Sequence, residues 1–179
     1  MAVVFLLPDA DVSNSPAWTI GTGSDVYAVL DDDDTGHVAS DSSDIEATAV
    51  GQICEVRFQD HSLDAGTTID SVQAVVKHNN RGRGTTYRIQ VEINHSGGTY
   101  YTENIEGSGA ASWVTAALTA RTTSDGSTAW SLSEINGLQM NLELSAISAG
   151  TVGITYAYFR VIYTPPVTAH NATFFGANF

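Results

Sequence analysis

Apolar and polar residues alternate along two segments of the chain, and this pattern predicts β-strands. Residues 87–93 place one tyrosine, one valine and two isoleucines at odd positions, with Arg88, Gln90 and Glu92 between them. Residues 138–144 place three leucines and one methionine at even positions. Successive side chains of a strand point to opposite faces, so a period of two predicts one buried and one solvated face. We therefore expect the apolar positions of both segments to face a core.

Further apolar, β-branched and aromatic segments predict additional strands between clusters of glycine, serine, asparagine and aspartate. Within 52–58 we expect Ile53, Val56 and Phe58 to point inward. Residues 131–135 are expected to hold one helical turn, and the acidic, serine-rich span between Leu30 and Gln52 is expected to be an exposed loop. The other expected strands are 2–7, 17–20, 25–30, 68–78, 99–104, 112–118 and 152–163.

About eight to ten strands without a convincing helix predict an all-β fold, an antiparallel β-sandwich. A jelly roll is favoured over an immunoglobulin-like sandwich because no Cys…Trp…Cys framework is present. The sandwich domain is expected to span residues 12–164, after an apolar strand or arm over residues 1–11. Pro165 and Pro166 stop the last strand because neither can donate to a sheet ladder. Residues 165–179 are then expected to form a C-terminal arm.

The net charge of the chain limits the classes of partner that it can bind. Asp and Glu outnumber Lys and Arg by 20 to 7, a formal net charge of −13. Such a chain repels phosphate backbones and anionic lipids, so we expect neither a nucleic-acid nor a membrane partner. Residues 1–8 are apolar but lack a basic segment and a small-residue cleavage site, so we expect the chain to be made in the cytoplasm.

No group of residues has the spacing that catalysis or metal binding requires. The single cysteine, Cys54, is expected to be a small buried hydrophobic residue, and the five histidines are separated in the sequence. The run Asp31–Asp34 begins like a calcium loop, but its twelfth position is Ser42 rather than a bidentate glutamate. We expect a solvated acidic loop there, with weak calcium binding as the alternative. We expect no catalytic, cofactor-binding or metal-binding residue and no enzyme activity.

Aromatic residues carry the remaining candidate sites. Trp18, Trp113, Trp130 and the pair Tyr100-Tyr101 are expected in the core or at a subunit interface, and a sugar-stacking platform is the alternative. The residues expected to bind a partner lie near the two ends of the chain: Phe5, Pro165, Pro166, Phe174, Phe175 and Phe179.

Several stretches resemble jelly-roll structural proteins of tailed bacteriophage virions. The similar stretches are the aspartate run after Leu30, an Ile-x-Ser-Val strand at 69–72, the stretch 130–139 and a closing strand from Tyr156 to Tyr163. The resemblance covers residues 12 to 164. It implies a capsid decoration (cement) protein or a minor head or tail protein, and it transfers no catalytic residue.

The function expected from this resemblance is non-enzymatic. The protein would decorate and stabilise a capsid shell as a homo-oligomer, with a trimer as the guess, and would bind the major capsid protein or another virion protein. Its location would be the virion. The alternative is a carbohydrate-binding, lectin-like module of a phage tail or fibre.

Overall fold

The computed structural model describes residues 1–15, 17–21, 25–31, 44–80, 86–95, 101–108 and 112–167. These residues form two antiparallel sheets packed as a sandwich, so the expected all-β fold is confirmed. None of the described helices is long and apolar enough to cross a membrane. The elements are β1 Ala2–Leu6, β2 Pro8–Ser13, β3 Thr19–Ile20, α1 Tyr27–Leu30, β4 Ile45–Ala47, β5 Ile53–Phe58, β6 Thr68–Asn80, β7 Thr86–Asn94, β8 Tyr101–Ser108, β9 Val114–Ala117, α2 Leu132–Ile135, β10 Gln139–Ile147 and β11 Val152–Thr164.

The strands from β4 to β11 form one long hairpin that is rolled into two sheets. Its antiparallel pairs are β4 with β11, β5 with β10, β6 with β9 and β7 with β8. Rolling also places β11 beside β6 and β10 beside β7. The resulting strand orders, β4-β11-β6-β9 and β5-β10-β7-β8, are those of a double-sheet jelly roll. We call the sheet containing β11 sheet A and the sheet containing β10 sheet B.

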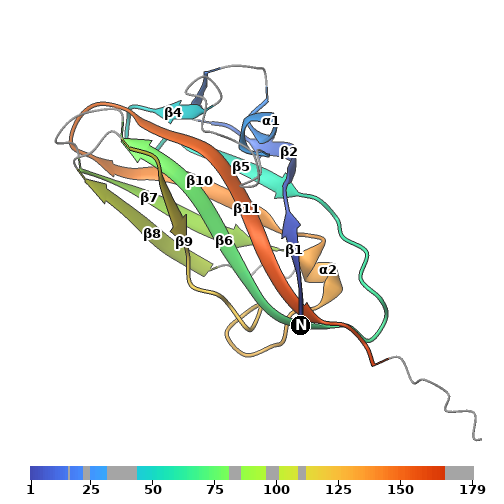
Figure 1. Cartoon of the computed structure of the whole chain (residues 1–179). Helices are drawn as coiled ribbons and strands as arrows, with labels where there is room; N and C mark the ends of the chain where they lie inside the picture. Colours follow the sequence, from blue (N-terminus) through green and yellow to red (C-terminus); the bar gives the residue numbers. More distant parts are fainter. Residues whose placement is uncertain are drawn as a thin grey trace, which may run out of the picture.

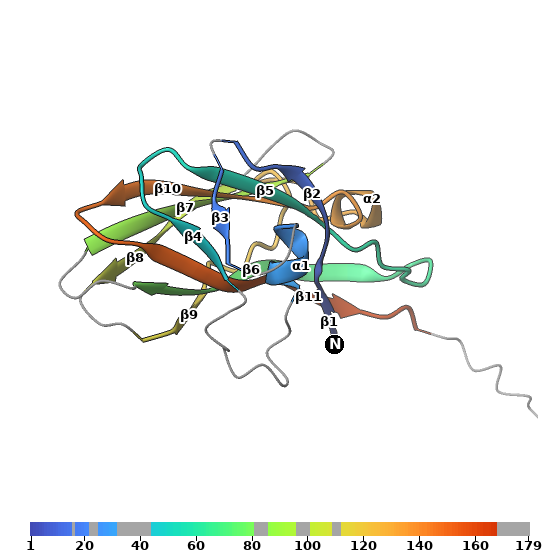
Figure 2. The same cartoon turned by 90° about the horizontal axis from the view of Figure 1, so that it is seen from above.

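The first strands extend both sheets. β1 pairs with β11 in sheet A, and β2, which follows after Leu7, pairs with β5 in sheet B. Figure 2 shows the two layers, with β5, β7 and β10 in one and β4, β6 and β11 in the other. In Figure 1, β1 runs beside β11 at the side of the sandwich, far from β8 and β9. The expected division into an arm over residues 1–11, a domain over 12–164 and an arm over 165–179 stays a prediction.

The core lies between the sheets and follows the predicted alternation. The apolar positions of 87–93 and of 138–144 are buried, and Arg88, Gln90 and Glu92 lie on the other side of β7. Phe58 of β5 and Phe159 of β11 meet edge to face across the core with ring centroids 4.5 Å apart. Cys54 is fully buried, as expected, and burial raises the pKa of its thiol. A fully buried phenylalanine side chain stabilises the fold by roughly 1.5–3 kcal/mol.

Three sequence-based expectations are wrong. Ile53 does not point inward: Cys54, Val56 and Phe58 share the buried face, and strict alternation puts Ile53 on the other one. The span from 30 to 52 is not loop throughout, because it contains β4, in which Ile45 and Ala47 are fully buried.

The third correction concerns residues 25–30, which form helix α1 rather than a strand. Val26, Val29 and Leu30 are buried at helical spacing. The carboxylate of Asp11 accepts hydrogen bonds from the backbone N–H groups of Val26 (3.0 Å) and Tyr27 (2.7 Å), which satisfies donors at the start of the helix. The helical turn expected at 131–135 is confirmed as α2, which begins with a capping box between Ser131 and Glu134.

Candidate functional site

The outer side of sheet B carries rows of carboxylate and carboxamide groups, interrupted on β5 by Ile53 opposite Glu143, which we call the polar face. Strand register aligns its side chains in rows across β5, β10, β7 and β8. Neighbouring strands lie about 4.8 Å apart, and successive outward residues on one strand lie about 6.8 Å apart. The central side chains are half-buried, and they are Glu55, Gln90, Glu92, Asn94, Gln139, Asn141 and Glu143.

Hydrogen bonds hold the planar groups of the polar face in place. Glu92 accepts from the side-chain amides of Gln90 (3.0 Å) and Asn141 (3.3 Å) through its two carboxylate oxygens. Glu55 accepts from the amide of Asn94 at 3.0 Å. In the described part of the chain the amide oxygens of Asn94 and Asn141 have no hydrogen-bond partner. Both oxygens are buried, so the network is ordered around two unpaired acceptors that solvent does not reach.

Two ion pairs border the polar face and leave its centre negative. Arg57 pairs with Asp9 at 3.0 Å, and Arg88 pairs with Glu106 at 2.7 Å. Within the described residues, no cationic side chain forms an ion pair with Glu55, Glu92 or Glu143. Nor do these residues contain any group of three or more His, Cys, Asp or Glu side chains that could hold a metal ion. The centre can accept hydrogen bonds but repels anions.

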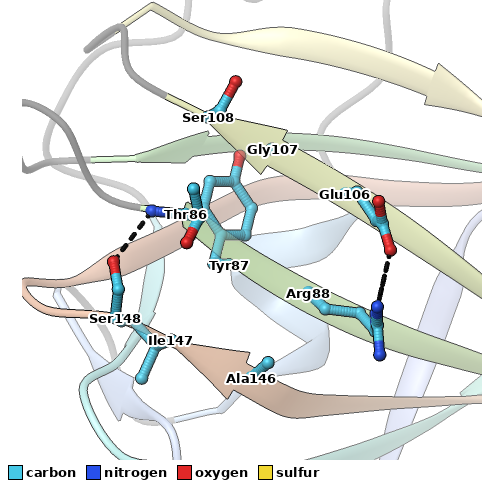
Figure 3. Close-up of a pocket in the computed structure, with 9 residues that line it drawn as sticks. All are labelled: Thr86, Tyr87, Arg88, Glu106, Gly107, Ser108, Ala146, Ile147 and Ser148. Carbon is cyan, nitrogen blue, oxygen red and sulfur yellow. Dashed lines mark hydrogen bonds and ion pairs between the residues drawn. The ribbon is translucent and has the colours of Figure 1, made fainter.

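A cavity of about 500 Å³ lies at one corner of sheet B (Figure 3). Its walls come from the ends of β7 and β8 and from the end of β10 and the residue after it. Arg88 and Glu106 form one side, and the hydroxyl of Ser148 accepts from the backbone N–H of Thr86 at 3.0 Å on the other. The corner therefore adds hydroxyl and charged groups to the rows of amides and carboxylates.

A second cavity, of about 440 Å³, opens between the edge strands β8 and β9. His78 of sheet A and Tyr87 of sheet B meet beside it, with 2.5 Å between Nδ1 and the phenol oxygen. Burial lowers the pKa of His78 and raises the pKa of Tyr87 to about 12. Both groups are therefore neutral near pH 7. The ring of Tyr87 lies against Gly107, where a Cβ atom would come within 2.2 Å of it.

The outer side of sheet A has the opposite chemistry. Tyr156, Tyr158 and Val75 form an apolar cluster there, more than nine-tenths buried, and Phe5 of β1 packs edge to face on Tyr158 with centroids 5.5 Å apart. Lys77 lies over the ring of Tyr156, 5.1 Å from its centroid. We call these five residues the aromatic face.

The residues expected to bind a partner are only partly within the described chain. Phe5 is half-exposed on β1, and Pro165 and Pro166 follow the end of β11, where Pro166 approaches Gly66. β1 pairs with the last residues of β11, from Phe159 to Tyr163, so β1 and the two prolines lie near the same end of sheet A. The expected partner residues Phe174, Phe175 and Phe179 lie outside the described residues, as do Asp32, Asp33 and Asp34.

Two of the three tryptophans are structural. Trp18 and Trp130 are buried, and their indole N–H groups donate to the backbone carbonyls of Gln52 (3.0 Å) and Arg121 (2.9 Å). This agrees with the expected core role and removes both residues from a sugar-stacking platform. Trp113 is half-buried, and Tyr100 lies outside the described residues.

The polar face was missed as a site by reasoning on the sequence. The alternation predicts the outward positions of β7 but gives them no role beyond the solvated face of a strand. The available signal was compositional: the outward positions from Gln90 to Asn94 and from Gln139 to Glu143 hold only glutamine, asparagine and glutamate.

Comparisons with known proteins give little beyond the fold. No protein-family model matches the sequence, and no curated protein matches it. A solved structure titled "CBM4 structure and function", a carbohydrate-binding module, is similar at 12% sequence identity, with a TM-score of 0.33. The match covers 68% of this chain and 78% of that chain. A similarity this weak carries no argument about function, and no comparison points to a virion protein.

Proposed function

We propose that this chain is a non-catalytic carbohydrate-binding domain that holds a neutral glycan on its polar face. The observation that carries the proposal is the ordered set of half-buried carboxylate and carboxamide groups on the outside of sheet B. These groups are prealigned by the strand register and by the bonds that Glu55 and Glu92 accept.

The chemistry of the groups selects the ligand class. A carboxylate only accepts hydrogen bonds, whereas a carboxamide both donates and accepts. Sugar hydroxyls do both, so a glycan can bond to neighbouring rows at once. The uncompensated charges of Glu55, Glu92 and Glu143 disfavour sulfated, phosphorylated or acidic sugars. The proposal is therefore limited to neutral glycans.

Binding on this face should be weak. No aromatic ring lies among its central residues, so hydrogen bonds must supply the affinity. A net contribution of roughly 1 kcal/mol per bond, for about four bonds, corresponds to a dissociation constant near the millimolar range. We therefore expect detection on multivalent surfaces before detection in solution.

A glycan array followed by titration tests the proposal. We expect binding to one class of neutral glycan, and about a tenfold or greater loss in the variants Glu143→Ala and Asn141→Ala. Asp64→Ala is the matched control, because Asp64 is an exposed carboxylate on the loop between β5 and β6. Binding only to acidic glycans, no binding to any neutral glycan, or equal losses in the control would contradict the proposal.

A second candidate function is a virion structural protein, which the resemblance in the sequence implies and the apolar side of sheet A favours. Val3 and Phe5 are exposed there, beside the end of β11. Such a protein would attach to the capsid or tail through this side and through residues 167–179.

Mass spectrometry of purified particles encoded by the same genome tests this candidate. A virion component is expected at a fixed number of copies per particle. Deletion of residues 167–179 should leave the melting temperature of the isolated domain nearly unchanged and weaken attachment. Absence from purified particles would exclude the candidate, and unfolding of the deletion variant would place the tail in the core.

A further inference from the structure

Among the described residues, β1 is an edge strand of sheet A that pairs with another strand on one side only. Residues 2–6 pair with β11 along their whole length, from Ala2 with Tyr163 to Leu6 with Phe159. Within the described residues, no backbone hydrogen bond joins residues 2–6 to any other segment. A strand edge of this kind presents a row of N–H and C=O groups that another strand can use.

The side chains of β1 do nothing to block such pairing. The strand reads Ala-Val-Val-Phe-Leu, with no charged residue and no proline before Pro8. Val3 is 46% exposed and Phe5 is 50% exposed, and both point to the outer side of sheet A. Proteins normally protect a free edge with lysine, proline, a bulge or a covering loop. An unprotected apolar edge therefore favours a strand as its partner.

We propose that two copies of this chain associate by antiparallel pairing of their β1 strands about a two-fold axis at Val4. In this register residue i of one copy faces residue 8 − i of the other. Val3 then lies opposite Phe5 of the second copy, and Phe5 lies opposite Val3. The four exposed apolar side chains meet on one face, and the two A sheets become one continuous sheet.

A second copy fits this edge better than an unrelated strand does for two reasons. The edge is self-complementary, as an isologous two-fold interface requires, because the same register pairs Val3 with Phe5 twice. The chain carries a net charge of −13, yet residues 1–8 contain no charged side chain, so contact here avoids the repulsion that other surfaces of two copies would meet.

The proposed interface is small, and it leaves the polar face of each copy uncovered. Five-residue pairing lies at the low end of interface sizes, so we expect a dimer that dissociates on dilution in the micromolar range. Both polar faces remain uncovered, because they belong to sheet B. The dimer would thus present two equivalent faces, whichever ligand they bind. The inference does not depend on the proposed function.

Cysteine cross-linking of the full chain tests the register. Residues directly opposite in an antiparallel pair have Cα atoms about 4.5–5.5 Å apart, within disulfide range, whereas diagonal neighbours lie about 7–8 Å apart, beyond it. Under mild oxidation we expect a mixture of the Val3→Cys and Phe5→Cys proteins to form far more covalent dimer than either protein alone. Native Cys54 is fully buried and does not compete. Equal cross-linking of either single variant and the mixture would overturn the register.

Sedimentation equilibrium tests the interface itself. The wild-type chain should dimerise at concentrations around 100 µM, and Val3→Lys should shift the dissociation constant at least tenfold toward monomer. Val12→Lys is the matched control, because Val12 is a strand valine exposed to 45%, but it lies on β2 of sheet B. A wild-type monomer at all concentrations, or equal effects of both lysines, would overturn the proposal. Thermal melting checks that both variants fold.

Discussion

The two outer faces of this sandwich are built from the same strand alternation and have opposite chemistry. On sheet B, the central outward positions of β7 and β10 are half-buried amides and carboxylates, and Gln90, Glu92 and Asn141 among them are joined by hydrogen bonds. On sheet A, the outward positions of β11 include Tyr156 and Tyr158, which are almost fully buried. Sheet A therefore buries apolar groups on both sides, whereas sheet B buries only its inner side.

This difference suggests a division of roles: the outer side of sheet A contributes to stability, and the outer side of sheet B is available for recognition. Apolar burial stabilises the fold by about 25 cal/mol per Å², so the aromatic face contributes to stability like a second core. Exposed polar contacts contribute little, so selection for stability alone does not account for the ordered rows on sheet B. If the division is correct, substitutions on sheet A should unfold the protein, and substitutions on the outside of sheet B should leave it folded.

The largest expected effect is on the aromatic face. Tyr158→Ala removes a buried ring that supports Phe5, and the resulting cavity should reduce the free energy of unfolding by about 3–5 kcal/mol. Urea denaturation followed by circular dichroism measures the change. Glu143→Ala, outward on sheet B, is the control and should change it by less than about 0.5 kcal/mol. Similar costs for both would show that the two faces do not differ in this way.

A smaller effect should separate the two sides of β7 itself. Val91 is fully buried, so Val91→Ala should cost about 1–3 kcal/mol by leaving a void. Gln90 points outward, so Gln90→Ala should cost little, although its amide donates to Glu92. Chemical denaturation of the two variants compares them directly. A larger cost for Gln90→Ala would mean that the polar network, rather than the core, dominates the stability of sheet B.

Sequence reasoning predicted the inner side of the sandwich better than its outer sides. The period of two in β7 and β10 was sufficient because one face is buried and the other is not. The expectation for Ile53 was wrong because it departed from this period: counting back by two from Phe58 and Val56 reaches Cys54, and Ile53 lies on the opposite face. The prediction also failed at 25–30, where helical spacing over six residues is too short to distinguish from a strand.

The chemistry of the outer faces depends on contacts that no single strand contains. On the outer side of sheet A, Tyr158 contacts Phe5 and Tyr156 contacts Lys77, and both contacting residues come from other strands. The polar face requires β5, β7 and β10 in a particular register. Such pairings join residues 39 to 49 positions apart, as in the bonds of Asn94 with Glu55 and of Asn141 with Glu92. Local patterns do not specify them.

Between the two sheets, the contact of His78 with Tyr87 should make stability depend on pH. Burial lowers the pKa of His78 in the folded state, so the unfolded chain binds the proton more tightly. Stability is then fully present above about pH 6.5, the unfolded value, and falls as the pH drops toward the lower folded pKa. The slope is at most about 1.4 kcal/mol per pH unit. Denaturation of wild type and His78→Gln at pH 7.5 and 5.5 measures it, and an equal loss in both would assign the effect to other groups.

The smallest expected effect concerns the ion pair between Arg88 and Glu106 at the corner of sheet B. Its side chains are 47% and 67% exposed, so water and salt screen the attraction across 2.7 Å. A double-mutant cycle with Arg88→Ala and Glu106→Ala should give a coupling free energy of less than about 1 kcal/mol, which falls further at 1 M salt. The pair borders the 500 Å³ cavity, so the same variants should alter glycan binding more than they alter unfolding. A coupling free energy well above 1 kcal/mol that persists in salt would instead show that this ion pair stabilises the fold. The exposed corner of sheet B would then contribute to stability, as sheet A does, and the distinction between the two faces would not hold there.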